Sequence, residues 1–563
     1  MHPLLIFAII VVCVALAANI VSNISSRRKR LEMLKHSFGK PPEDDEYIQF
    51  KSIGRYAQFM QTHSTTKQIV DTTTWNDLEM DKVFNRINSC QTSIGEEYLF
   101  HNLQQLPLND KALKSREELI KFFENNPETR LKIQFLLARR VGKENYNGLT
   151  SLMFAPSINM LKHRHIYTVL AFVPLLFIAL MPINLPIGVI GLVGAFVINM
   201  FVHYGTKSRI ATLIPSIKYL TGVLYCCKSL AKIKEMQGLP IMTEIHALHK
   251  KLKSLQRKVP RAASTASGDL ADSLFEYVNI MFLSDIRNYN KFVGTVKARS
   301  EAFHALYRAI GELDISICIL SFRLSLPVYS LPEFISDGVG ELTDGHKAPI
   351  DHKIPIVFED IFHPLITDPV TNTGIIQNDC LLTGSNASGK STFIKALAIN
   401  GILAQTINTA AAKAFRARFS LILTSMVVRD DLSAGDSYFI VEIKSLKRVL
   451  DMVENFPCTC YIDEILRGTN TIERIAASAS VLSHLHMQNA LCIAASHDIE
   501  LTKILDGKFD NFHFREHVTE DGIVFDYKLN HGPSTTRNAI KLLRVMGFSE
   551  EIVGDAERLC EGY

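Results

Sequence analysis

The longest apolar segments of the chain lie within its first 210 residues. The first covers residues 3–24, which contain no Asp, Glu, Lys or Arg, and the basic run 27–30 follows it. As a helix, this segment would extend about 33 Å, enough to cross a bilayer core of about 30 Å. Because the positive charges follow the apolar run, we predict a membrane anchor at residues 1–26 with the following chain in the cytoplasm. The alternative is a cleaved signal peptide, since residues 15–17 resemble a cleavage site.

The second apolar segment covers residues 166–204, again without a charged residue. A single helix of this length would extend about 58 Å, too long to cross a bilayer once. Pro182, Asn184 and Pro186 lie near its middle and predict a turn. We therefore predict two membrane helices joined by a tight outer loop, about three spans in total, in a multi-pass protein of the cell membrane. The alternative is a buried helical hairpin in the core of a soluble domain.

The remaining pattern predicts two different folds. Residues 27–70 are a mixed polar linker, and apolar residues recur at helical spacing through much of 71–335. Prolines and glycines between 327 and 340 mark a boundary. Over residues 350–530, short apolar runs alternate with helical patterns, which is typical of an α/β domain with a mostly parallel sheet.

The amino-acid composition and net charge exclude some classes of protein. Hydrophobic residues make up 47% and charged residues 21% of the 563 positions, which excludes a disordered chain. The net charge of +4 argues against binding to nucleic acid mainly through bulk positive charge. Ten cysteines are too few for a disulfide scaffold and fit reduced thiols in a cytosolic compartment.

One segment carries a phosphate-binding motif, G-x-x-x-x-G-K-[ST]. An apolar run at 380–382 precedes it and a helical run at 392–400 follows it, the strand–loop–helix context that this motif needs. Lys390 is expected to reach the β and γ phosphates of ATP, and Ser391 to hold Mg²⁺. The predicted nucleotide-binding residues are Gly384, Ser385, Asn386, Ala387, Ser388, Gly389, Lys390, Ser391 and Thr392.

Two further strand-like runs end in groups suited to hydrolysis. The run 458–462 ends in Asp463 and Glu464, and the run 491–495 leads to His497. We expect Asp463 to bind Mg²⁺ through water and Glu464 to orient or deprotonate the attacking water. We expect His497 to contact the γ phosphate or that water. The alternatives are a solvated acidic pair and an ordinary polar residue at a strand end.

These motifs resemble a known family. Residues 463–471, Asp-Glu-Ile-Leu-Arg-Gly-Thr-Asn-Thr, resemble the D-E-x-x-R-G-T signature of MutS-type mismatch-repair ATPases. Residues 430–439 resemble the family's segment between its two Walker motifs, in which Ser437 matches a serine that reaches the partner's γ phosphate across a dimer. Asn372 resembles the family's asparagine near the adenine. Residues 531–563 resemble its C-terminal helical dimerisation segment.

The resemblance runs from about Thr74 to the C-terminus and implies a multidomain fold. It has an all-α core and lever domain at 71–335, interrupted by the membrane hairpin, and an α/β P-loop NTPase domain of the ABC-like, MutS type at 350–530. It also implies two ATP and Mg²⁺ sites at a homodimer interface. ATP would close the dimer, hydrolysis would reopen it, and the levers would carry the change to distant domains.

The departures from the family concern DNA. Only about 70 residues precede the core, so we expect no mismatch-reading domain with its Phe-x-Glu wedge; Phe514-Arg515-Glu516 fits that tripeptide only by chance. The membrane hairpin lies where the family inserts a DNA-gripping clamp between its levers. Six basic residues between Lys250 and Arg261 allow three interpretations: a solvated helix face, contact with anionic lipid, or contact with DNA phosphates.

Three functional hypotheses follow. The first is a membrane-anchored MutS-family ATPase that associates with DNA and a lipid bilayer. The second is an ATP-driven membrane switch that acts on a protein or lipid partner without DNA. The third is a transporter, which the few spans and their lack of charged residues favour least.

Overall fold

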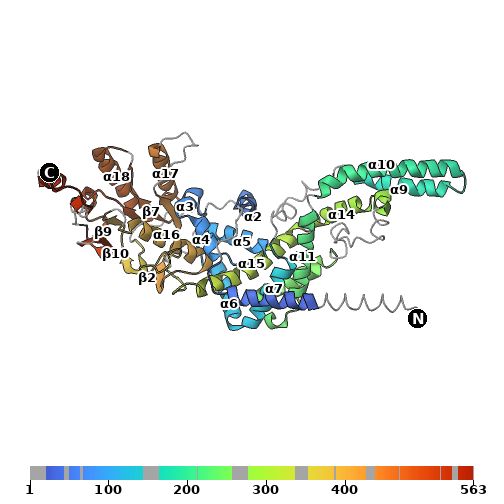
Figure 1. Cartoon of the computed structure of the whole chain (residues 1–563), viewed down its shortest axis with the longest axis horizontal. Helices are drawn as coiled ribbons and strands as arrows, with labels where there is room; N and C mark the ends of the chain where they lie inside the picture. The colour runs from blue at the N-terminus through green and yellow to red at the C-terminus, as the bar shows by residue number, and fades with distance from the viewer. Residues whose placement is uncertain are drawn as a thin grey trace.

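The molecule is elongated, with an α/β part at one end, a helical part in the middle and a two-helix arm at the other end (Figure 1). The computed structural model describes residues 21–42, 50–63, 68–143, 161, 164–211, 214–255, 277–335, 353–385, 388–426, 438–467, 469–519, 522–534, 540, 543–544 and 546–561.

The helical part is assembled around one long helix, α15 (Ser300–Leu324). Its segment from Leu313 to Arg323 is buried at every position, because most of its residues are apolar and neighbouring helices pack around it. The other helices of this part are α2 (Phe50–His63), α3 (Thr72–Asp77), α4 (Met80–Ile87), α5 (Ser93–Gln104), α6 (Lys111–Asn125), α7 (Pro127–Arg140), α11 (Ile214–Leu230), α12 (Pro240–Leu252) and α14 (Ser284–Ala298).

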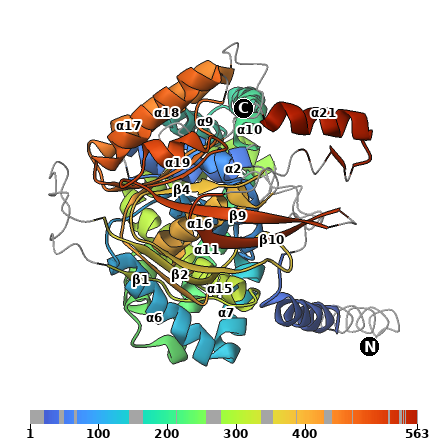
Figure 2. The same ribbon diagram turned by 90° about the vertical axis from the view of Figure 1, so that its left-hand side faces the viewer.

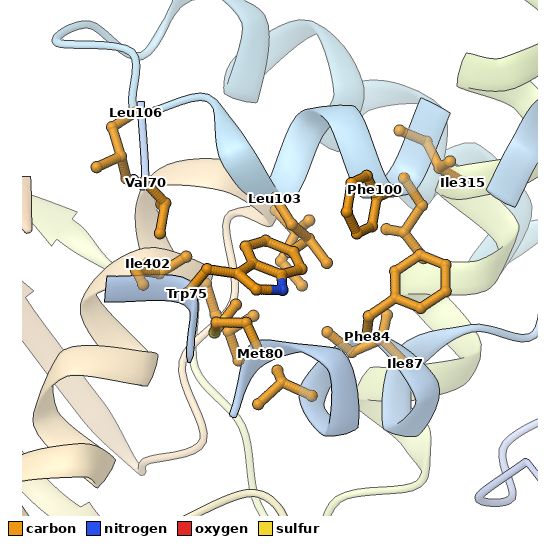
Figure 3. Close-up of a cluster of buried hydrophobic side chains, with 14 of the residues drawn as sticks. Val70, Trp75, Met80, Phe84, Ile87, Phe100, Leu103, Leu106, Ile315 and Ile402 are labelled. Carbon is orange, nitrogen blue, oxygen red and sulfur yellow. The ribbon is translucent and has the colours of Figure 1, made fainter. Parts of the chain in front are cut away.

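One hydrophobic cluster joins the helical part to the α/β part (Figure 3). The Trp75 ring lies edge-on to Phe100, with 4.9 Å between centroids, and its Nε1 donates to Asp81 at 2.8 Å. Ile402 of α16 (Lys390–Ile407) reaches the same cluster. Since these side chains share one core, the two parts are packed together rather than linked loosely.

The α/β part contains two sheets. The larger has the order β10-β9-β4-β8-β7-β6, in which all neighbours are parallel except the β9–β10 pair. Its strands are β4 (Cys380–Thr383), β6 (Leu421–Ser425), β7 (Cys458–Asp463), β8 (Ala490–Ala495), β9 (Asp510–Thr519) and β10 (Gly522–His531). The smaller sheet has the order β1-β5-β2-β3, formed by β1 (Glu333–Phe334), β2 (Ile356–Ile361), β3 (Asn372–Ile376) and β5 (Ala414–Ala417).

Helices pack on the larger sheet or follow it in sequence (Figure 2). Besides α16, they are α17 (Tyr438–Val453), α18 (Thr471–His486), α19 (Glu500–Ile504) and α21 (Glu550–Glu561). The expected fold class, a multidomain chain with a helical N-terminal part and an α/β C-terminal part, is confirmed.

The arm consists of two antiparallel helices, α9 (Arg164–Leu180) and α10 (Leu185–Ala211), joined by the turn 181–184. Among the described residues, only Leu185–Thr206 is long and apolar enough to cross a membrane. The 17-residue α9 extends about 25 Å, less than a bilayer core. The expectation of about three spans is therefore not supported. Residues 1–20 of the anchor expected at residues 1–26 lie outside the described part.

The apolar side chains of the arm face outward. Val169, Leu176, Ile190 and Phe201 are each more than half exposed. A hairpin in the core of a soluble domain would bury these side chains, so that alternative is wrong for this chain.

Candidate functional site

The phosphate-binding loop connects the central strand β4 to the start of α16. Gly384 and Gly389 have φ of 138° and 103°, a backbone region that favours glycine. A Cβ at Gly384 would meet the carbonyl oxygen of Phe514 at 2.7 Å. The loop therefore lies close to β9 and opens onto the N-terminus of an 18-residue helix, which favours anions.

Lys390 lies inside the curve of this loop. Its Nζ donates to the carbonyl oxygens of Gly384 at 2.8 Å and Ser385 at 2.7 Å. Burial lowers the pKa of Lys390, and the nearby carboxylates Asp463 and Glu464 act in the opposite direction. The Lys390 amino group therefore lies where the motif places the β and γ phosphates. Asn386 and Ala387 lie outside the described residues.

The first turn of α16 meets the end of β7. The Ser391 side chain lies close enough to Asp463 to favour the ionised form of its carboxyl group, and Ser391 and Thr392 are both exposed. Burial raises the pKa of Asp463, whose Oδ1 has no hydrogen-bond partner among the described atoms. Two oxygen donors distant in sequence therefore lie together, with one buried oxygen still able to accept. This donor set fits Mg²⁺, a hard cation that prefers oxygen ligands.

Glu464 is held at both carboxylate oxygens. His497 Nε2 lies 2.8 Å from Oε1, and Arg467 Nη1 lies 2.7 Å from Oε2. The hydrogen bond from His497 lowers the pKa of Glu464, which keeps this group ionised and able to accept a proton. The backbone of Glu464 has φ of 55°, and its N–H donates to Ala495 of β8 at 3.0 Å. Asp463 and Glu464 are both largely buried, so they differ from a solvated acidic pair at the end of a strand.

Asn372 lies on β3 and uses both ends of its amide within the protein. Its Nδ2 donates to the carbonyl oxygen of Tyr527 at 3.1 Å, and its Oδ1 accepts from the N–H of Leu529 at 2.8 Å. A Cβ at Gly389 would lie 3.0 Å from the Tyr527 ring. Asn372 therefore fixes the segment of β10 that borders the phosphate loop, and its contact with adenine stays a prediction.

Sequence reasoning missed two residues of this site. Arg467 is three residues after Glu464, and that spacing within the signature could have indicated a contact. Glu516 accepts a hydrogen bond from the Ser385 hydroxyl, but no sequence signal links β9 to the loop. Ser437 lies outside the described residues, which resume with α17 at Tyr438.

Comparison with known proteins agrees with this geometry. Residues 380–562 match the family described as MutS domain V, which covers the loop, both carboxylates and His497. The part of the chain that contains the site is therefore similar to domain V of the MutS family.

Individual proteins with MutS names match slightly less than half of the chain. A DNA mismatch repair protein MutS of Natronomonas pharaonis is 29% identical over 272 residues, 47% of this chain and 30% of the relative. MutS of Thermus aquaticus is 27% identical over 269 residues, 47% of this chain and 31% of the relative. MutS protein homolog 4 of Mus musculus is 30% identical over 277 residues, 46% of this chain and 27% of the relative. The matched part of the chain thus spans less than a third of the length of these relatives.

Proposed function

We propose that this chain is a membrane-associated MutS-family ATPase that binds and hydrolyses ATP at a homodimer interface to drive a conformational switch. The observation that carries the proposal is the meeting of three separate segments at one edge of the larger sheet. The loop with Lys390, the paired carboxylates Asp463 and Glu464, and His497 all lie at the carboxyl ends of β4, β7 and β8. Ligands bind at this edge in α/β folds of this kind.

In the proposed reaction, backbone N–H groups of the loop and the ammonium of Lys390 bind the phosphates of ATP. Ser391 and Asp463 would hold Mg²⁺, which neutralises phosphate charge when it is bound. Glu464 orients the attacking water and accepts its proton, because its carboxylate is ionised. His497 and Arg467 hold that carboxylate in place through its two oxygens.

The homodimer is supported by an exposed apolar surface on the C-terminal segment. Met546, Phe548, Ile552 and Leu559 are about half exposed or more, on α21 and the residues before it. Such side chains at the end of a chain are typical of a protein–protein contact. In the proposed dimer, Ser437 of each copy completes the ATP site of the other.

The two functional alternatives differ in what the switch moves. DNA association is supported by the similarity to MutS proteins, since the relatives from Natronomonas pharaonis and Thermus aquaticus are named DNA mismatch repair proteins. Lys250 and Lys251 at the end of α12 are exposed and could contact phosphates. The alternative is a switch that acts on a protein or lipid partner without DNA, and the exposed apolar arm favours it.

The test is ATP hydrolysis by the full chain in lipid nanodiscs, with and without duplex DNA at several salt concentrations. Glu464→Gln should retain ATP binding and lose hydrolysis by about 100-fold or more. Lys390→Ala should lose binding, and Glu500→Gln, at an exposed position of α19, is the matched control. Normal hydrolysis by Glu464→Gln would refute the proposed site. Hydrolysis that DNA leaves unchanged, together with no DNA binding, would favour the alternative function.

A further inference from the structure

The base of the arm is covered by a third helical segment. The Asn199 amide of α10 donates to the carbonyl oxygens of Leu170 at 3.1 Å and Met281 at 2.6 Å. The Arg287 guanidinium of α14 lies over the Phe172 ring, 5.6 Å from its centroid. The Phe196 and Tyr277 rings are 6.4 Å apart. Of these contacts within the described part of the chain, the ones nearest the turn involve Phe172 on α9 and Phe196 on α10, and the turn projects beyond α14 (Figure 1).

The end of the arm beyond these contacts, which we call its uncovered end with respect to the described residues, is short. It consists of residues 173–180 of α9, the turn 181–184 and residues 185–195 of α10. At about 1.5 Å per residue, the two helices extend about 12 and 16 Å beyond their last contacts with the covering segment. This is about half of a hydrocarbon core of about 30 Å, the depth of one leaflet.

Charged groups at the base set a limit to deeper insertion. Asp285 and Arg287 lie in the first turn of α14, and Arg287 lies directly beside α9. Moving the turn across a whole bilayer would bring these two charges into hydrocarbon, which is strongly unfavourable. With only the uncovered end inserted, both charges remain at the level of the lipid headgroups.

The turn itself is suited to hydrocarbon rather than to water. Most of its backbone N–H groups are satisfied within the hairpin, which a lipid environment favours. Pro182 and Pro186 have no N–H group, and Ile183 is 82% exposed. The N–H groups that find acceptors within 3.3 Å belong to Met181, Ile183, Asn184, Ile187 and Gly188.

The uncovered end is also closely packed. A Cβ at Gly188 would meet Met181 at 2.7 Å, and one at Gly191 would meet Phe177 at 2.1 Å. Small residues at these positions let the two helices approach closely, so the end forms a stiff apolar wedge. Its outward surface carries Leu176, Ile183 and Ile190, each more than half exposed.

We propose that this wedge, residues 173–195, inserts into the single bilayer leaflet that faces the arm and does not cross the membrane. The apolar surface of the wedge contacts the acyl chains of phospholipids. The proposal rests on the membrane association within the proposed function but not on ATP hydrolysis. It replaces the expected pair of spans with an insertion in which both helices enter and leave on the side of the α/β part.

The first experiment measures the depth of the turn in the full chain. The sequence has one tryptophan, Trp75, which is buried. We would place a second by Ile183→Trp and reconstitute the protein in phosphatidylcholine vesicles whose acyl chains carry bromine at different depths. A leaflet insertion predicts strongest quenching by bromines near the bilayer centre. The unsubstituted protein, in which only Trp75 reports, supplies the background.

The second experiment measures access from each side. Ile183→Cys would be made in a Cys560→Ser background, since Cys560 is exposed, and treated with a membrane-impermeant maleimide on sealed vesicles of either orientation. Lys250→Cys is the control for access from the side of the α/β part.

Protection of the Ile183→Cys thiol on both sides, with labelling after detergent, is the expected result. Labelling only from the side opposite Lys250 would establish a span, and labelling from the same side without bromine quenching would indicate a protein partner or a second copy. Either result overturns the proposal. ATP hydrolysis by the same samples shows separately whether the ATPase assignment holds.

Discussion

At the scale of single residues, the site depends on how neighbours fix the charge of Glu464. His497 and Arg467 contact its two oxygens, and the backbone at Glu464 is left-handed, with φ of 55°. A carboxylate held in this way is oriented before substrate arrives. The rate of ATP hydrolysis should therefore depend on residues that do not themselves contact the phosphates.

His497→Ala should lower kcat roughly 10- to 100-fold, because Glu464 loses one of its two orienting contacts. The contact with His497 lowers the pKa of Glu464, so its loss should raise that pKa and move the acid limb of the rate profile to higher pH. The measurement is kcat against pH, with His484→Ala on α18 as the control. An unchanged profile with reduced kcat would show that His497 does not act through Glu464.

Asp314 should make stability depend on pH. It is fully buried in α15, accepts hydrogen bonds from Gln91 and Thr92, and burial raises its pKa to about 6. A carboxyl with a raised pKa in the folded state destabilises that state once it ionises. The free energy of unfolding therefore falls as the pH rises from about 4 to about 6, by on the order of 2–3 kcal/mol.

Thermal unfolding of the detergent-solubilised chain checks this. As the pH rises from 4 to 6, the stability of the natural protein should fall relative to that of Asp314→Asn. A constant difference between the two proteins would show that Asp314 ionises at the same pH in the folded and unfolded chain.

At the scale of elements, α16 links the proposed nucleotide site to the helical part. Its N-terminus carries Lys390, and its last turn carries carbonyl groups bound by two buried arginines. Arg116 of α6 donates to Thr406 at 2.8 Å, and Arg323 of α15 donates to Asn408 at 2.9 Å. A positive charge at a helix C-terminus is favourable, so both helices are tied to the end of α16 opposite the phosphates.

Arg323→Met should destabilise this junction by about 3–5 kcal/mol, because it leaves the carboxylate of Glu117 without its buried partner. The double substitution Arg323→Met with Glu117→Gln should be less harmful than the single one. The measurement is the thermal midpoint of unfolding. Arg308→Met, which removes an exposed ion pair with Glu244, is the control and should change the midpoint little.

At the scale of the whole molecule, the α/β part and the arm lie at opposite ends, with α15 between them (Figure 1). The N-terminal end of the helical segment 21–37 points toward the same end as the arm. A membrane at that end would leave the α/β parts of two copies free to pair away from the lipid surface. The composite dimer predicts complementation between different inactive chains.

Ser437→Ala and Lys390→Ala should each abolish most hydrolysis as pure proteins. Mixed in equal amounts, they should recover up to about a quarter of the natural activity, because half of the dimers then contain one intact composite site. Mixing Lys390→Ala with Glu464→Gln should give no recovery, since both residues belong to the same side of the site. Full activity of pure Ser437→Ala would contradict the composite site.

The sequence by itself determined the local chemistry and the class of fold. The spacing of Gly384, Gly389 and Lys390 requires a strand–loop–helix unit, and alternating apolar runs require a parallel sheet in the C-terminal part. The turn between α9 and α10 follows from its prolines. These features depend on neighbours in the chain, and local sequence is sufficient to specify them.

Only the tertiary structure decided which distant groups meet. The order of strands brings Glu464 beside His497 and Ser385 beside Glu516, and no spacing in the sequence encodes that order. The length of the apolar segment likewise predicted two spans, which the structure does not support: α9 has only 17 residues, and α14 carries Asp285 and Arg287 at the base of the arm. Contacts between remote segments are set by packing, so the arm's hydrophobicity predicted a lipid contact while its neighbours decide how far it can enter.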